Sequence, residues 1–125
     1  MVRKVLIVED IEICAATLEI ALLKVPELIV ESATSAEQAL RVLSDGDGDI
    51  AALITDIHLP RMDGFELIEE IRSQPRFSHL PILVISGDSD PTTPGRLERL
   101  GADAYFPKPY SPAEVRQRLE ELIHG

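Results

Sequence analysis

Residues 50–64 read IAALITDIHLPRMDG, a sequence that passes from an unbroken apolar run to an acidic residue and then to a proline-containing loop. The apolar run predicts a buried strand, because strands inside a parallel sheet are apolar on both faces. Asp56 ends this run, so we expect its carboxylate at the carboxyl edge of the sheet, where open α/β folds bind ligands. Pro60 cannot continue a strand, and Asp63 predicts a turn or the N-cap of a helix over residues 65–72.

The composition limits the classes of function. With 125 residues, of which 45% are hydrophobic, the chain is long enough for one domain with its own core. Its net charge of −10 argues against direct binding of nucleic acid, whose phosphates select basic surfaces, and favours a site for cations. The single cysteine, Cys14, excludes an internal disulfide and indicates a reducing compartment. No apolar run is long enough to span a membrane, so we expect a soluble cytoplasmic protein without a membrane partner.

Strand and helix patterns alternate along the chain. The predicted strands cover residues 5–8, 28–33, 50–55, 80–85 and 103–106, and the predicted helices cover residues 11–25, 35–43, 65–72, a segment from 90 or 93 to 100, and 111–123. Such alternation predicts parallel strands joined by right-handed crossovers, with helices on both faces. We therefore expect an α/β fold built on one doubly wound sheet, without a linker or a second domain.

Two local patterns need separate interpretation. The apolar residues on one face of the first helix are expected to be buried: Ile11, Ala15, Leu18, Leu22 and Val25. Residues 45–49 read DGDGD and resemble part of a calcium-binding loop, but glycine and glutamate are missing where an EF-hand requires them. We therefore interpret this segment as a solvated turn.

The candidate functional residues lie where predicted strands end. They are Glu9 and Asp10 after the first strand, Asp56 after the third, Ser86 after the fourth and Lys108 after the fifth. Two like charges at ~4 Å repel by about 4 kcal/mol at an effective dielectric near 20, so clustered carboxylates need a cation or a raised pKa. Oxygen ligands without a Cys or His cluster favour Mg²⁺. Together with the hydroxyl of Ser86 and the ammonium of Lys108, these carboxylates indicate phosphoryl transfer to an aspartate. Taken alone, however, an aspartate beside a turn is more often a local hydrogen-bonding group.

These residues, in this order and spacing, resemble a response-regulator receiver domain of bacterial two-component signalling over essentially the full chain. The matching features are Glu9-Asp10, Asp56 with the LPRMDG of residues 59–64, Ser86-Gly87, the GADAY of residues 101–105, and Lys108-Pro109. The resemblance implies a flavodoxin-like fold with five parallel strands in the order 2-1-3-4-5 and five helices. It also implies one receiver domain over residues 1–125, with no output domain in this chain.

The resemblance implies a phosphoacceptor and a metal site. Asp56 would accept a phosphoryl group from the phosphohistidine of a sensor histidine kinase or phosphotransfer protein. Asp10 and Asp56 would bind Mg²⁺ directly, Glu9 would bind it through water, and the backbone carbonyl of His58 would complete the protein ligands. The His58 side chain would lie near the mouth of the site, in a position to tune hydrolysis of the acyl phosphate.

The resemblance further implies a switch. Ser86 would donate to the phosphoryl group and Lys108 would pair with it. Tyr105 would change rotamer as Ser86 moves, which would alter the surface formed by the fourth helix, fifth strand and fifth helix for a downstream protein or output domain. The Lys108-Pro109 peptide bond would be cis. Ala104 replaces the second acid of receivers that dimerise through this surface, so we expect a monomer or weak dimer.

The phosphorylation switch would assist its own phosphorylation and dephosphorylation, but it would not be an enzyme for external substrates. Three alternative functions stay open beside it. A small aspartate-based phosphatase usually carries a second acid where this chain has His58, and it has a cap domain. A flavodoxin-like cofactor binder needs a Ser/Thr/Gly phosphate cradle after the first strand, where residues 9–12 read EDIE. A degenerate receiver would act only as a docking module, against which the complete residue set argues.

Overall fold

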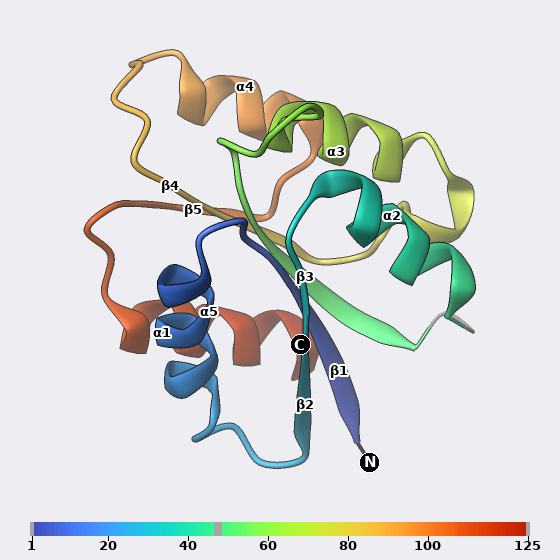
Figure 1. Ribbon diagram of the computed structural model, residues 1–125, viewed down its shortest axis with the longest axis vertical. Coiled ribbons are helices and arrows are strands. Elements are labelled where there is room, and N and C mark those ends of the chain that lie inside the picture. Colours follow the sequence, from blue (N-terminus) through green and yellow to red (C-terminus); the bar gives the residue numbers. More distant parts are fainter. Residues whose placement is uncertain (1, 47–48, 125) are drawn as a thin grey trace.

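The computed structural model describes residues 2–46 and 49–124 and contains one parallel sheet within them (Figure 1). The strands are β1 (Arg3–Val8), β2 (Leu28–Ala33), β3 (Ile50–Asp56), β4 (Ile82–Ser86) and β5 (Ala104–Pro107). Their order is β2-β1-β3-β4-β5, and every neighbouring pair is parallel. The doubly wound α/β fold and its strand order are therefore confirmed.

Helices cover both faces of the sheet. The described residues form α1 (Glu12–Leu22), α2 (Ala36–Asp45), α3 (Gly64–Arg72), α4 (Thr93–Leu100) and α5 (Pro112–His124), with a short 3₁₀ helix η1 (Pro75–Phe77). Figure 1 shows α1 and α5 on one face and α2, α3 and α4 on the other. Val5 and Ile7 of β1 pack into the core under α1 and α5, whereas Leu6 and Val8 pack into the core under α2, α3 and α4. Successive strand residues point to opposite faces, which is why this buried strand is apolar throughout.

The turn after β3 fixes the position of the residue at the end of that strand. Asp63 is the N-cap of α3: its carboxylate accepts from the Glu66 N–H at 2.9 Å, and the Glu66 carboxylate accepts from the Asp63 N–H at 3.3 Å. A Cβ on Gly64 would lie 2.4 Å from the backbone oxygen of Asp56, so only glycine lets α3 begin this close to β3. The helix start thus holds the end of β3 in place.

The first helix differs from its prediction. Ile11 was expected on its buried face but precedes the helix as an exposed N-cap, because its N–H donates to the Glu9 carboxylate at 3.1 Å and its backbone is extended. Val25 is buried as expected, yet it lies beyond the end of the helix at Leu22. Leu18 and Leu22 are buried, as predicted.

An apolar stripe runs along the solvent side of α1. It consists of Ile13, Ala16, Ile20 and Leu23, of which Ile13, Ile20 and Leu23 are 74%, 66% and 78% exposed. These residues recur at helical spacing, and Leu23 is the C-cap. The helix is therefore apolar on two sides, which explains why periodicity alone gave too broad a buried face.

Other boundaries differ slightly from the predicted ones. β4 begins at Ile82, after Pro81 and not before it, and the Ile82 N–H donates to the carboxylate of Asp103 at 2.8 Å. Asp103 therefore precedes β5 as a side-chain acceptor and does not begin that strand. α4 begins at Thr93, the later of the two predicted starts. The turn predicted at residues 45–49 includes residues 47 and 48, which lie outside the described residues. Within the described ranges, no helix is both long and apolar enough to cross a membrane.

Candidate functional site

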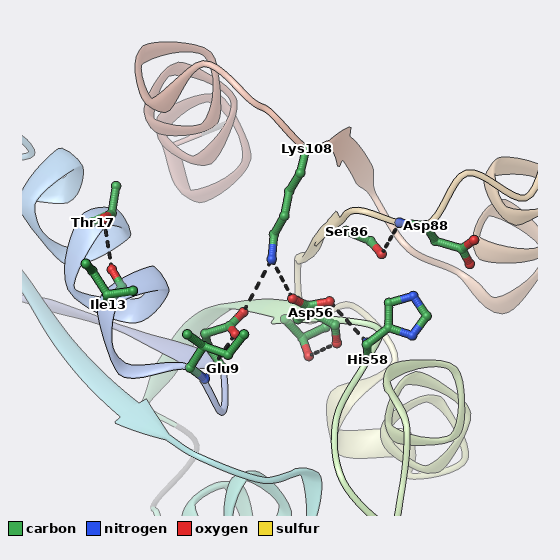
Figure 2. A network of polar contacts seen from close by, with 10 residues as sticks. Glu9, Ile13, Thr17, Asp56, His58, Ser86, Asp88 and Lys108 are labelled. Atoms are coloured by element: carbon green, nitrogen blue, oxygen red, sulfur yellow. Dashed lines mark hydrogen bonds and ion pairs between the residues drawn. The ribbon is translucent and has the colours of Figure 1, made fainter.

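Side chains from three strand ends meet at the carboxyl edge of the sheet (Figure 2). Asp56 is the last residue of β3 and Glu9 directly follows β1, and both are buried. Lys108 follows β5; its Nζ donates to Asp56 Oδ2 at 2.7 Å and lies 3.9 Å from Glu9 Oε2. One ammonium group thus bridges two buried carboxylates from separate strands, as the predicted topology requires.

The surroundings of Asp56 keep its carboxylate charged. Burial by itself would raise its pKa, but hydrogen bonds with Lys108, Glu9 and the His58 backbone N–H outweigh burial and lower the pKa below the usual value. The His58 N–H donates to Oδ1 at 3.1 Å, so each carboxylate oxygen has a donor. Asp56 and Lys108 also line a cavity of about 270 Å³ between α1 and α5. An ionised aspartate can act as a nucleophile.

Glu9 has the opposite shift. Burial, followed by the hydrogen bond and the charge of Asp56, raises its pKa to about 7, against the smaller effects of the Ile11 N–H and Lys108. Near neutral pH, Asp56 is therefore ionised while Glu9 is partly protonated. A nearby cation would allow both to ionise.

The predicted metal ligands are only partly assembled. Among residues 2–46 and 49–124, no three Asp, Glu, His or Cys side chains are grouped so as to hold a metal ion. The structure brings Glu9 and Asp56 together, whereas Asp10 is exposed and lines a separate pocket with Glu9 and Glu12. The side chain of His58 is exposed. An oxygen-only donor set whose glutamate resists ionisation fits a hard divalent cation that keeps several waters.

The predicted switch residues meet through a third residue. Ser86 ends β4 and is fully buried, and its Oγ accepts from the Asp88 N–H at 3.0 Å; Figure 2 shows this contact beside Asp56. The hydroxyl of Tyr105 donates to the backbone oxygen of Asp88 at 3.3 Å. Asp88 was not among the predicted site residues, although the Asp, Ser, Thr, Pro and Gly residues of positions 86–95 are a signal for local side-chain hydrogen bonds.

The loop after β5 is fixed to β4. The Lys108 backbone N–H donates to the backbone oxygen of Ser86 at 2.8 Å. The Lys108-Pro109 peptide bond is cis, as predicted. Burial would lower the pKa of Lys108, but the hydrogen bond and charge of Asp56 and the charge of Glu9 raise it. The lysine is therefore a fixed positive charge at the site.

Comparisons with known proteins identify similar sequences. A family model described as "Response regulator receiver domain" matches residues 5–120. The chain is 34% identical over 117 residues to Protein RcaC of Microchaete diplosiphon, covering 94% of this chain but only 18% of that protein. It is 32% identical over 118 residues to the two-component response regulator ORR13 of Oryza sativa subsp. japonica, covering 94% of this chain and 96% of the relative.

Solved structures agree with these sequence matches. The signal receiver domain of a signal transduction histidine kinase from Syntrophus aciditrophicus matches with a TM-score of 0.88 and 28% identity, covering 98% of this chain and 91% of that one. The receiver domain of sensor histidine kinase PA1611 from Pseudomonas aeruginosa PAO1 matches with a TM-score of 0.86 over all of both chains and holds a magnesium ion in its active-site cleft. At 24% identity, this second match shows the shared fold alone.

Proposed function

The chain belongs to the response regulator receiver domains of two-component signalling, and we propose that it accepts a phosphoryl group on Asp56 from a phosphohistidine of a sensor histidine kinase or phosphotransfer protein. The observation that carries this function is the ionised, buried Asp56 carboxylate, paired with Lys108 at the end of β3. A carboxylate oxygen of Asp56 would attack phosphorus while the N–P bond breaks and its electron pair returns to the donor imidazole. Reactions of this kind depend mainly on positioning and charge neutralisation.

Mg²⁺ is the expected cofactor. Glu9, Asp10, Asp56 and the backbone carbonyl of His58 would hold it, Glu9 through water. The ion would supply charge neutralisation at the phosphoryl oxygens. The raised pKa of Glu9 supports this proposal, because burial and the neighbouring Asp56 carboxylate both disfavour its ionised form, which a cation would stabilise.

Lys108 and Ser86 would bind the transferred group. The Lys108 ammonium already lies 2.7 Å from an Asp56 oxygen, so it needs only a short movement to pair with a phosphoryl oxygen on that carboxylate. The Ser86 hydroxyl, whose oxygen accepts from the Asp88 N–H, would donate to a second phosphoryl oxygen. Both groups would thus neutralise or hydrogen-bond the charged oxygens of the acyl phosphate.

Phosphorylation would then change a protein-binding surface. Movement of Ser86 would allow Tyr105 to change rotamer and alter the face formed by α4, β5 and α5, which a downstream protein or an output domain would recognise. The chain would act as a switch in the cytoplasm, as a monomer or weak dimer, and not as an enzyme for external substrates. Steady turnover of an added phosphomonoester would instead support a phosphatase.

The decisive test is Mg²⁺-dependent labelling by a small phosphodonor such as phosphoramidate, measured as a mass gain of one phosphoryl group. Wild type is expected to be labelled with Mg²⁺ and not with EDTA. Asp56→Asn is expected to lose labelling, whereas Asp45→Asn, at the exposed end of α2, is the matched control and should keep it. Undiminished labelling of Asp56→Asn would refute the assignment of the phosphoacceptor.

A further inference from the structure

Asp88 connects β4, β5 and α4 through its backbone and its side chain. Its backbone N–H donates to Ser86 Oγ at 3.0 Å, and its backbone oxygen accepts from the Tyr105 hydroxyl at 3.3 Å. Its carboxylate accepts from the Thr93 hydroxyl at 3.0 Å and from the Asp90 N–H at 2.9 Å. One residue therefore contacts both predicted switch residues and the first residue of α4.

The start of α4 depends on such contacts. The helix has eight residues, its N-cap Thr92 makes no side-chain capping hydrogen bond, and Pro94 lies in its first turn. Thr93 is nonetheless buried, and its hydroxyl reaches the Asp88 carboxylate. A negative charge beside a helix N-terminus is also favourable. The Asp88 carboxylate thus holds the beginning of a short helix, together with the Asp90 carboxylate, which accepts from the Thr92 N–H at 2.9 Å and from the Thr92 hydroxyl at 2.8 Å.

We propose that the Asp88 carboxylate is a latch for the unphosphorylated state, an inference that rests on the proposed phosphorylation of Asp56. Ser86 Oγ, which is turned toward the Asp88 N–H, has to move in order to donate to a phosphoryl group on Asp56. A part-buried N–H left without a partner is costly, so Asp88 moves with Ser86. The same movement strains the contacts that Asp88 makes with Tyr105 and Thr93, and α4 is released. Asp88 is therefore a positioning residue that sets how far phosphorylation is coupled to α4.

The two kinds of contact can be separated by mutation. Backbone contacts to Ser86 and Tyr105 survive substitution of the Asp88 side chain, whereas the contact to Thr93 needs a side-chain oxygen at position 88. Asp88→Ala and Thr93→Val each remove that contact, from opposite ends. Asp88→Asn retains an oxygen that can accept from the Thr93 hydroxyl, but it removes the charge.

The test is a titration with beryllofluoride, a mimic of the phosphoryl group, in the presence of Mg²⁺, followed by the amide NMR signals of α4. Without the latch, less free energy opposes the bound state, so Asp88→Ala and Thr93→Val should each bind about three- to tenfold more tightly than wild type. Before beryllofluoride is added, the α4 amide signals of both variants should already be displaced toward their bound positions. The double variant should bind no more tightly than either single variant, because both remove the same contact.

Asp88→Asn is the matched control and should stay close to wild type. Unchanged affinity in Asp88→Ala would refute the latch, as would a gain shared by Asp88→Ala and Asp88→Asn but absent from Thr93→Val, which would be an effect of charge alone. Thr93→Val keeps every acidic group and also tests the contact if Asp88→Ala fails to fold. Failure of the wild-type chain to bind beryllofluoride would instead refute the proposed function, and the latch with it.

Discussion

Glu9 and Asp56 depend on each other for their charge. The pKa of Glu9 is raised to about 7 by burial and by Asp56, whereas the pKa of Asp56 is lowered because its hydrogen bonds with Lys108, Glu9 and His58 outweigh burial. A carboxyl whose pKa is raised on folding stabilises the fold below its unfolded pKa, and this contribution is lost as pH rises through the folded pKa. Asp56 behaves in the opposite way, since its contribution is present above its unfolded pKa and is lost as pH falls.

The free energy of unfolding should therefore respond to pH and Mg²⁺ together. In EDTA, stability of the wild type is expected to fall between about pH 5 and about pH 8, as Glu9 ionises with a pKa of about 7. Mg²⁺ should offset this loss and so stabilise the protein more at the higher pH. Urea unfolding across this pH range measures both effects. Glu9→Gln removes the titrating group, and an identical pH profile in that variant would show that another residue is responsible.

At the scale of one element, α1 combines two functions that its sequence does not separate. Its buried residues Leu18 and Leu22 pack on the sheet, whereas the large residues of its exposed apolar stripe are Ile13, Ile20 and Leu23. The same helix borders the site, because its residue Thr17 lines the cavity that also contains Asp56. A phosphodonor protein that reaches Asp56 would therefore meet this apolar surface, whose burial would contribute to docking.

A charge on the stripe should separate protein donors from small donors. Ile13→Asp and Ile20→Asp are expected to lower the rate of phosphotransfer from a histidine kinase that labels the wild type by about tenfold, because each places a charge in an apolar contact. Labelling by phosphoramidate should be unchanged, since a small donor needs no docking surface. Val2→Asp is the control, because Val2 is 60% exposed at the other end of β1. Equal losses with both donors would mean that the substitutions damage the site itself.

For the whole molecule, the features that topology dictates could be predicted from the sequence, whereas those that depend on the path of a loop could not. Apolar runs indicated the strands, and the common edge of parallel strands brought Glu9, Asp56 and Lys108 together. Ile11 was misplaced because α1 is apolar on two sides, so helical periodicity could not define one buried face. Asp88 was missed because its backbone contacts to switch residues arise from the conformation of the β4–α4 loop, which no residue type specifies.

The two faces of the sheet should unfold as one unit, because every central strand contributes to both cores. In β3, for example, Leu53 packs on the side of α2, α3 and α4, its neighbour Ile54 packs on the side of α1 and α5, and both are buried. Leu53→Ala and Ile54→Ala should each cost about 2–5 kcal/mol. The chain's two tyrosines report on different faces. Tyr105 packs against the first core, which lies under α2, α3 and α4, and Tyr110 packs against the second core, which lies under α1 and α5.

Tyrosine fluorescence can therefore follow each core separately, in Tyr110→Phe for the first and Tyr105→Phe for the second. In either background, the urea midpoint from fluorescence should coincide with the midpoint from circular dichroism, as a two-state transition requires. Leu53→Ala and Ile54→Ala should lower the midpoint in both backgrounds, whichever core the substitution lies in. A substitution that shifts only the tyrosine on its own side would show that the cores unfold independently. Phosphorylation at the sheet edge could then act on α4 without affecting the face formed by α1 and α5.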